Sequence, residues 1–236
     1  MLEIKNIKIN TGDKEIIRDV SLSLEKGSVH ILMGPNGSGK STLLNGIFGH
    51  PNNSITGGFI LLDGEDITNL KTEQKARKGM FLSMQQLPKI EGVTLLQCLY
   101  IAAKKSIGNI SIFDFHKMIK EKAEKIGINT KFLLKDINSG LSGGEKKQTE
   151  ILHLMAISPK FAFLDEVDSG VDVESAKKVF GGIKILRKQG TGFVLVTHNV
   201  NVLDFIMPDK VSIMKEGRIV MSGGSELVDR INIEGF

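Results

Sequence analysis

The sequence predicts an α/β protein whose core is a mainly parallel sheet. Short, nearly all-apolar runs at Val29–Met33, 161–164 and 193–196 are typical of parallel strands that are buried on both faces. A helical pattern at Val173–Lys188 separates two of these runs, and strands that alternate with helices imply crossover connections. Such sheets bind ligands beyond the carboxyl ends of their strands, so we expect the functional residues there.

The first third of the chain reads as strands joined by turns, and the last third returns to alternating strands and helices. Apolar residues alternate over 2–9 up to a turn at 11–14, and a second run follows at 16–24. The segment 59–62 predicts a further strand, and 210–221 predicts a hairpin.

The middle of the chain has a different spacing of apolar residues. Apolar residues recur at helical spacing over 94–128, which predicts an inserted helical subdomain. We expect a single domain over the whole chain, in which 87–148 forms the helical subdomain. The remaining core is then made of 1–86 and 149–236.

The composition excludes several classes of function. The net charge is +4, but the basic residues are scattered, so nucleic acid is not an expected partner. The single cysteine, Cys98, allows no internal disulfide. It also excludes a zinc or iron–sulfur site made only of this chain's thiolates.

Membrane insertion is not expected either. No apolar run approaches the roughly 18 to 20 residues that a transmembrane helix needs. The N-terminus begins directly in a strand pattern, without the apolar region of a leader peptide. We therefore expect a soluble protein of the cytoplasm, with a plastid or another organelle as the alternative.

The strongest motif is a glycine-rich loop between the strand Val29–Met33 and a predicted helix at 41–48. Its glycines let successive N–H groups point at phosphate oxygens, and the helix N-terminus adds its partial positive charge. Lys40 can then reach the β- and γ-phosphates, while the Ser41 hydroxyl can ligate Mg²⁺. The predicted ATP-binding residues are Gly34, Pro35, Asn36, Gly37, Ser38, Gly39, Lys40, Ser41 and Thr42.

Two acidic residues follow the apolar run 161–164. A buried strand would deliver Asp165 beside the magnesium ion, where it can hold the ion through water. Glu166, one residue further on, can act as the general base that polarises the attacking water. An apolar strand that ends in acids is a weak signal alone, but it becomes specific beside a phosphate loop.

A second glycine-containing segment precedes a helical run at 146–157. Its residues are Ser142, Gly143, Gly144 and Glu145. Free amides at a helix start can meet an anion. The same segment can equally be a helix cap with Ser142 as the N-cap residue, and the two readings are compatible.

The order of these motifs resembles the ABC ATPase family. Gln85 falls 45 residues after Lys40 and matches the family's Q-loop glutamine, and His198 follows the run 193–196 as its switch histidine. The resemblance implies a P-loop NTPase cassette, with a RecA-like parallel core, an antiparallel β subdomain and an inserted helical subdomain. It also implies ATP and Mg²⁺ as ligands, with Gln85 joining Ser41 and Asp165 at the metal.

The resemblance further implies roles for individual residues. Lys40, Glu166 and His198 would be catalytic, with His198 bonding the γ-phosphate and the attacking water. Ser142, Gly143, Gly144 and Glu145 match the signature motif, which in this family completes the ATP site of a second copy. Asp172 matches the D-loop, which couples the two sites. One departure lies near Thr11, where many members have an aromatic residue that stacks on adenine.

Three further details narrow the resemblance. They are Gly144-Glu145-Lys146-Lys147 in the signature, Val167-Asp168-Ser169 after the acidic pair, and Phe113-Asp114-Phe115 in the helical region. These details are similar to the SufC family, the ATPase subunits of the SUF iron–sulfur cluster assembly machinery, and the similarity runs from Leu2 to Gly235. Gln148 stands where that family usually has arginine.

The narrower resemblance implies partners. They would be SUF scaffold subunits, SufB-like or SufD-like, which dock on the helical subdomain with contacts between Leu87 and Phe115. ATP would join two copies into a homodimer and pull the docked scaffold into another shape. The chain itself would hold no iron–sulfur cluster, which agrees with its single cysteine.

Three other functions share some of these features. An ATPase subunit of a membrane transporter would share every catalytic residue and is the main alternative. A DNA-tethering or repair ATPase would carry long coiled coils between the phosphate loop and the signature, and no heptads occur there. A nonenzymatic ATP sensor would normally lack Glu166 or His198, and both are present.

Overall fold

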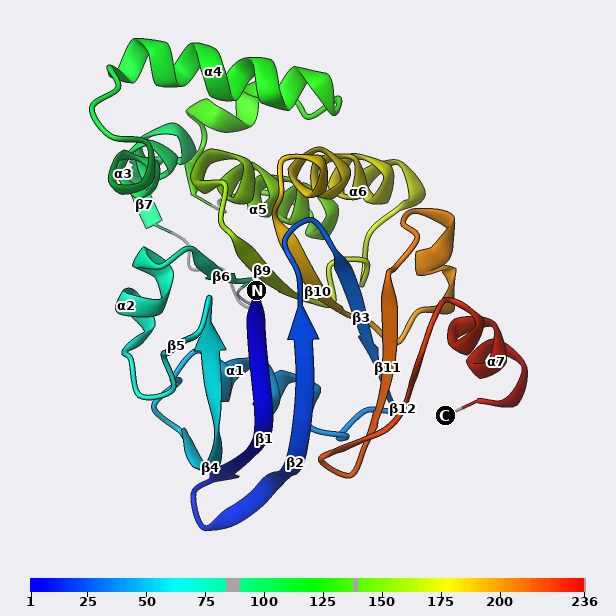
Figure 1. The fold of residues 1–236 in the computed structure, drawn as a ribbon. Helices are drawn as coiled ribbons and strands as arrows, with labels where there is room; N and C mark the ends of the chain where they lie inside the picture. The colour runs from blue at the N-terminus through cyan, green and yellow to red at the C-terminus, as the bar shows by residue number, and fades with distance from the viewer. Residues whose placement is uncertain (84–89, 138–139, 236) are drawn as a thin grey trace.

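The computed structural model describes residues 1–83, 90–137 and 140–235 (Figure 1). Ten of its strands form one mixed sheet in the order β5-β4-β1-β2-β12-β11-β3-β10-β9-β6. Their bounds are β1 Leu2–Thr11, β2 Lys14–Leu24, β3 Val29–Met33, β4 Asn53–Leu62, β5 Glu65–Asp66, β6 Met80–Leu82, β9 Phe161–Asp165, β10 Gly192–Val196, β11 Lys210–Lys215 and β12 Arg218–Gly223. This arrangement confirms the predicted α/β class.

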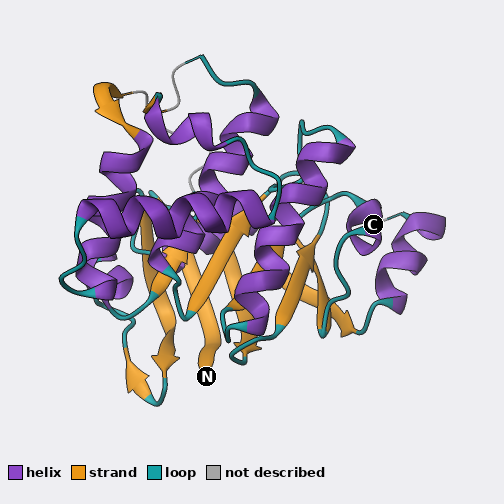
Figure 2. Ribbon diagram, turned by 90° about the horizontal axis from the view of Figure 1, so that it is seen from above, coloured by secondary structure: helices purple, strands orange, loops and turns teal. Residues whose placement is uncertain are grey.

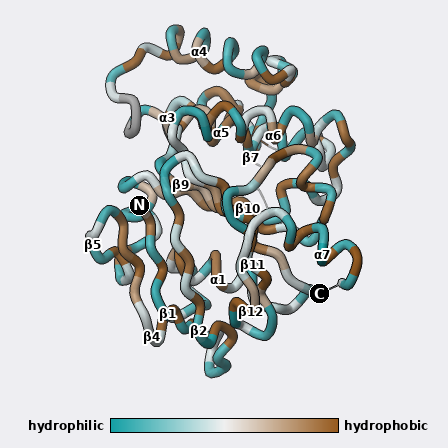
Figure 3. The backbone as a smooth tube through the Cα atoms, turned by 45° about the vertical axis from the view of Figure 1, so that its right-hand side comes forward, coloured by the Kyte–Doolittle hydropathy of each residue, from teal (hydrophilic) through white to brown (hydrophobic). Residues whose placement is uncertain are grey.

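The parallel core consists of β11, β3, β10, β9 and β6, which pair in parallel with their neighbours. Every residue of β3, β9 and β10 is buried, as the all-apolar runs predicted. Successive side chains enter two different hydrophobic clusters, for example Ile31 on one face and Leu32 on the other. In Figure 3 hydrophobic colour gathers in these central strands.

Helices cover both faces of the sheet. On one face lie α5, Gly143–Ile157, and α6, Val173–Lys188, which pack against each other and contribute to one cluster (Figures 1 and 2). On the other face lies α1, Lys40–Ile47, which packs with β1, β2 and β4 in the second cluster. The bounds of α6 agree with the prediction, and α1 begins one residue earlier than predicted.

The antiparallel part is formed by β1, which pairs with β2 and β4, and by the β11–β12 hairpin. The strand predicted at 59–62 in fact begins at Asn53. The missed segment contains Gly57 and Gly58, which are poor strand formers. Pairing with β1 imposes the strand, and Gly58 fits an irregularity in that pairing, because a Cβ there would lie 2.3 Å from the carbonyl oxygen of Lys5.

The region predicted as a helical subdomain over 94–128 contains two helices. They are α3, Leu95–Ile107, and α4, Ile112–Lys125. Gly108, with a φ of 76°, ends the first helix, and the Ser111 hydroxyl caps the second by accepting from the Asp114 N–H. A two-stranded sheet of β7, Ile90–Thr94, and β8, Asp136–Ile137, lies beside α3.

Several elements have no counterpart among the sequence predictions. They include the short helix α2, Thr72–Arg77, the C-terminal helix α7, Glu226–Glu234, and the 3₁₀ turns η1, Thr130–Leu134, and η2, Val200–Asp204. In the part of the chain that the structure describes, no helix combines the length and the apolar character that crossing a bilayer requires.

Candidate functional site

The phosphate loop, residues 34–41, connects β3 to α1, and close packing sets its shape. Gly34 has a φ of 156°, and a Cβ there would lie 2.1 Å from the carbonyl oxygen of Met214 in β11. Gly39 has a φ of 104°, and a Cβ there would lie 2.8 Å from Cδ1 of Ile17 in β2. Only glycine fits at these two points. The loop leads into the N-terminus of α1, the end of a helix that attracts anions.

Lys40 is the first residue of α1, and its ammonium group lies inside the loop. Nζ donates to the carbonyl oxygens of Gly34 at 2.8 Å and Pro35 at 2.9 Å. The residue is only 7% exposed. Burial lowers the pKa of Lys40, whereas the negative charges of Asp165 and Glu166 raise it. The structure therefore brings the phosphate loop and the acidic strand end close enough to act on each other.

The donor set at this point fits magnesium. Ser41 and Thr42 lie in the first turn of α1, and the Asp165 side chain is buried at the end of β9. Hydroxyl and carboxylate oxygens are ligands that Mg²⁺ prefers. Within 1–83, 90–137 and 140–235, no group of three or more histidines, cysteines or acids is arranged to hold a metal. An ion here would take its remaining ligands from phosphates and water. The predicted ligand Gln85 lies outside the described residues.

The two acids differ in exposure. Asp165 is 4% exposed, and its backbone N–H donates to the Ser83 hydroxyl at 2.7 Å. Glu166 adopts a left-handed φ of 52°, and its N–H donates to the carbonyl of Val196 at the end of β10. This conformation is uncommon for a residue other than glycine. It ends the strand abruptly and leaves the Glu166 side chain 40% exposed.

His198 follows β10 and lies beside Glu166. Its Nδ1 is 3.4 Å from Glu166 Oε1, so the predicted base and the switch histidine are neighbours. The turn before it is fixed by Thr197, whose hydroxyl donates to Asp168 Oδ2 at 2.7 Å and accepts from the Asn199 N–H at 2.9 Å. Burial raises the pKa of Asp168, while the Thr197 hydroxyl lowers it. Sequence analysis gave Asp168 no role at this turn.

The signature segment is a helix cap. The Ser142 hydroxyl accepts from the Glu145 N–H at 3.2 Å, and Glu145 Oε2 accepts from the Ser142 N–H at 2.7 Å. This reciprocal pair is a capping box, and it starts α5 three residues before the predicted position. The hydrogen bond from the Ser142 N–H lowers the pKa of Glu145. Ser142 and Gly143 are both exposed.

The signature segment packs directly against the D-loop and the start of α6. A Cβ on Gly144 would lie 2.7 Å from the Ser175 hydroxyl oxygen. Asp172 caps α6 by accepting from the Ser175 N–H at 2.9 Å and from its hydroxyl at 2.7 Å. Gln148 Nε2 donates to the same hydroxyl at 3.1 Å. Ser175 therefore links the signature helix to the D-loop, a connection that sequence analysis missed.

The position near Thr11, where family members often have an aromatic residue, is the end of β1. The Thr11 hydroxyl donates to Asn53 Oδ1 at 2.8 Å, so it holds β1 to β4. A small hydroxyl offers no face for stacking on adenine. Nucleotide affinity is therefore expected to depend mainly on the phosphate contacts.

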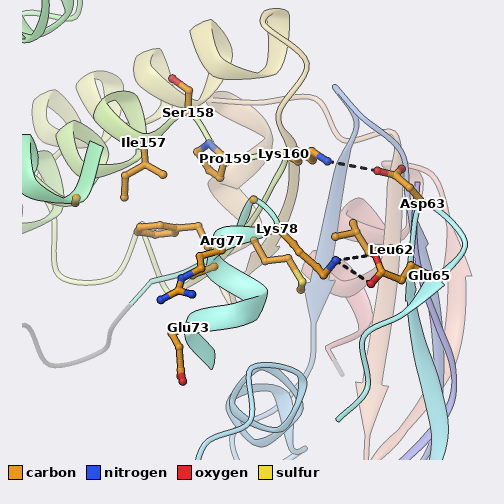
Figure 4. Close-up of a pocket in the computed structure, with 15 residues that line it drawn as sticks. Leu62, Asp63, Glu65, Glu73, Arg77, Lys78, Ile157, Ser158, Pro159 and Lys160 are labelled. Carbon is orange, nitrogen blue, oxygen red and sulfur yellow. Dashed lines mark hydrogen bonds and ion pairs between the residues drawn. The ribbon is translucent and has the colours of Figure 1, made fainter. Parts of the chain in front are cut away.

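Two cavities flank α2. The larger, of about 800 Å³, is bounded by α2, the turn after β4, the chain after α5 and Ala102 of α3 (Figure 4). Its rim carries two ion pairs, Lys78–Glu65 at 2.7 Å and Lys160–Asp63 at 3.7 Å. The second, of about 550 Å³, extends from α1 to Asp165 and shares Ala76, Met80 and Phe81 with the first.

Comparison with known proteins identifies the family of the chain. The chain matches the ABC transporter family model over residues 17–169. It is 42% identical over 239 residues to a "Probable ABC transporter ATP-binding protein" of Streptococcus pyogenes serotype M3, covering 100% of this chain and 93% of that protein. It is 41% identical over 238 residues to "Vegetative protein 296" of Bacillus subtilis strain 168, covering 100% and 91%. A "Probable ATP-dependent transporter" of Synechocystis is 38% identical over 241 residues, with 100% and 94% covered.

Solved structures show the same fold. A nucleotide-free ATP-binding cassette from an ABC transporter superposes with a TM-score of 0.79 at 26% identity, covering 98% of this chain and 93% of that one. The ADP conformation of another such cassette superposes with a TM-score of 0.79 at 27% identity, covering 99% and 95%. The fold and the phosphate site define a nucleotide-binding P-loop cassette. The chain belongs to the ABC ATPase family, and it is an ATP-binding ATPase of that type.

Proposed function

We propose that this ATPase is the energy-supplying subunit of a SUF iron–sulfur cluster assembly complex, and that it dimerises on ATP to change the shape of SufB-like or SufD-like scaffold subunits. The observation that carries the docking part is a set of exposed apolar side chains between Leu87 and Phe115. Phe113 is 83% exposed, Ile101 67% and Ile112 40%. Large apolar side chains at a surface favour an interaction with another protein. The SUF assignment itself rests on the resemblance to the SufC family.

The hydrolytic roles follow from the placement of the side chains. The loop amides and Lys40 would hold the β- and γ-phosphates, while Ser41 and Asp165 would hold Mg²⁺, which neutralises phosphate charge when bound. Glu166 would take a proton from the water that attacks the γ-phosphorus, as the bond to the bridging oxygen breaks. The distance of 3.4 Å between Glu166 and His198 supports a joint role in placing that water.

The signature residues would act on the ATP of a second copy. Ser142 and Gly143 are exposed at a helix start, which supports contact with an anion outside this chain. Asp172 and Ser175 tie that helix to the D-loop, so a change at one site can reach the other through this link. Two ATP molecules would then lie between two copies and join them.

A second candidate function is the ATPase subunit of a membrane transporter. The relatives' names favour it, because they describe ABC transporter ATP-binding proteins and ATP-dependent transporters. Both functions use the same hydrolytic residues. They differ in the partner, which would be a soluble scaffold in one case and an integral membrane protein in the other.

The test is purification of the tagged chain from its native host, followed by mass spectrometry. SufB-like or SufD-like proteins without stoichiometric membrane protein support the SUF role. The Phe113→Ser variant should reduce their recovery, whereas Ile233→Ser, which changes an equally exposed apolar residue on α7, should not. An integral membrane protein in stoichiometric amount would instead establish the transporter function.

A further inference from the structure

Lys75, in the short helix α2, is a buried lysine in an unusual position. It is 0% exposed, and it is among the largest fully buried side chains of the molecule. Burial lowers the pKa of Lys75 to about 8. A buried ammonium group is costly, and an apolar side chain of similar volume would avoid that cost. The presence of a lysine at this point therefore indicates a requirement for its hydrogen bonds.

The hydrogen bonds of Lys75 reach the phosphate-loop helix. Nζ donates to the carbonyl oxygen of Ile47, the last residue of α1, at 2.6 Å, and to that of Thr68 at 3.1 Å. Thr72, also in α2, donates its hydroxyl to the carbonyl oxygen of Phe48 at 2.7 Å. The last carbonyls of a helix have no partner within the helix and carry partial negative charge. Two side chains of α2 thus hold the C-terminal end of α1.

The other end of α1 is the phosphate site. The helix spans only the 8 residues Lys40–Ile47, so about 12 Å separates its two ends. Backbone hydrogen bonds connect the two turns of this helix directly, so we expect a displacement of Ile47 to displace the first turn. A cation at the C-terminus and phosphates at the N-terminus also both agree with the direction of the helix dipole.

The helix α2 is also connected to Asp165, the proposed magnesium ligand. It leads through Gly79, with a φ of 95°, into β6, and Ser83 then accepts a hydrogen bond from the Asp165 N–H. It also borders both cavities, through Ala76. Lys75 therefore lies in the short helix that connects a surface groove, the phosphate-loop helix α1 and Asp165, the proposed magnesium ligand.

From these contacts we infer that Lys75 is a positioning residue of the ATP site. Together with Thr72 it holds the C-terminal end of α1 and so sets the place of the loop amides. Nucleotide affinity depends on this placement, whereas the chemical step at Glu166 does not. The inference rests on the part of the proposed function that assigns the phosphates to the loop, and it is independent of the SUF role.

The experiment measures the Kd for a fluorescent ATP analogue with Mg²⁺, and kcat at saturating ATP, in the full chain. Lys75→Met should weaken binding about tenfold, the effect of losing a charged hydrogen bond. Its kcat should stay within about twofold, since the groups that act on the water are unchanged. Thr72→Val removes one neutral hydrogen bond and should weaken binding about threefold. Lys75→Arg keeps the donors and should restore most of the affinity.

A matched control is Lys122→Met. Lys122 Nζ donates to the carbonyl of Met155 near the end of α5 at 2.6 Å, which is the same kind of contact on a different helix. This variant should leave the Kd unchanged. An unchanged Kd in a folded Lys75→Met protein contradicts the inference. Should that variant fail to fold, an unchanged Kd in Thr72→Val contradicts it. Lys40→Ala, measured in parallel, must lose binding, and retained binding there would contradict the phosphate-loop assignment itself.

Discussion

The phosphate loop and the signature segment both present a helix N-terminus, but the protein holds them in different ways. Tertiary packing fixes the loop: Gly34 lies against β11, and Lys40 is 7% exposed beside the acids of β9. The signature is fixed mainly by its own capping box, and Ser142 and Gly143 remain exposed. The first half of the site is therefore preformed inside one chain. The second is a rigid local motif on a surface that can meet another copy.

The largest expected effect is on the chemical step, because the proposed base Glu166 lies close to the phosphate loop of the same chain. Glu166→Gln removes the proposed base and should lower kcat by about 10²- to 10⁴-fold. ATP should still bind, so the variant should accumulate as an ATP-bound dimer. Phosphate release and size-exclusion chromatography with ATP measure the two effects. The control is Glu174→Gln, a 78% exposed carboxylate on α6, and near-normal turnover by Glu166→Gln would show that another group is the base.

The phosphate loop and the signature segment should also differ in how much stability a glycine-to-alanine substitution costs. Gly34→Ala places Cβ against a main-chain carbonyl at a positive φ, and it should cost about 3 kcal/mol of unfolding free energy. Gly144→Ala places Cβ 2.7 Å from the hydroxyl oxygen of Ser175 and 3.1 Å from its Cβ, so a side chain rather than the main chain must shift. The helical position also favours alanine, so the cost should be smaller, about 1 kcal/mol. Urea unfolding measures both. Equal losses would contradict the difference between the halves.

A fall in pH should lower the free energy of unfolding through His30, which lies on β3, the strand before the phosphate loop. Burial, and then the charge of Lys210, lower the pKa of His30 from 6.5 to about 4. Between these values the unfolded chain binds the proton and the folded chain does not. Stability is therefore lost as the pH falls through this window, by up to about 3 kcal/mol. Urea unfolding at several pH values should show this loss in the parent and a smaller one in His30→Gln. An equal loss of stability in His30→Gln would show that another group causes the pH dependence.

The smallest stability effect is expected at the signature cap. Ser142→Ala removes one capping hydrogen bond and should cost about 1 kcal/mol. Ser111→Ala is the matched control, because Ser111 caps α4 in the same way through the Asp114 N–H. Both variants should lose similar stability, but only Ser142→Ala should slow ATP hydrolysis. If both variants hydrolyse ATP at the parent rate, the signature serine serves only as a cap.

The parts of the site that sequence predicts are those encoded by consecutive residues. The spacing of Gly34, Lys40 and Ser41, the acids after 161–164 and the Ser142 cap each depend on a few neighbours in the chain. Their chemistry can therefore be recognised without knowledge of the fold. The fold class followed for the same reason, since each buried strand is a continuous apolar run.

The parts that sequence analysis missed depend on distant partners. Lys75 meets Ile47 across 28 positions, and Thr197 meets Asp168 across 29. A lysine on a short polar segment reads as a solvated surface residue, because nothing local shows that α2 packs against the end of α1. The helical spacing over 94–128 also gave no helix boundary at Gly108, since apolar residues recur on both sides of it.

The central claim is that the phosphate loop of one copy and the signature of another form one ATP site. The direct test mixes Lys40→Ala, which keeps its signature, with Ser142→Arg, which keeps its phosphate loop. Each variant alone should be nearly inactive. In an equimolar mixture, heterodimers with one intact site should restore about a quarter of the parent turnover by mass action. No recovery, in a mixture shown to contain heterodimers, would contradict the shared site.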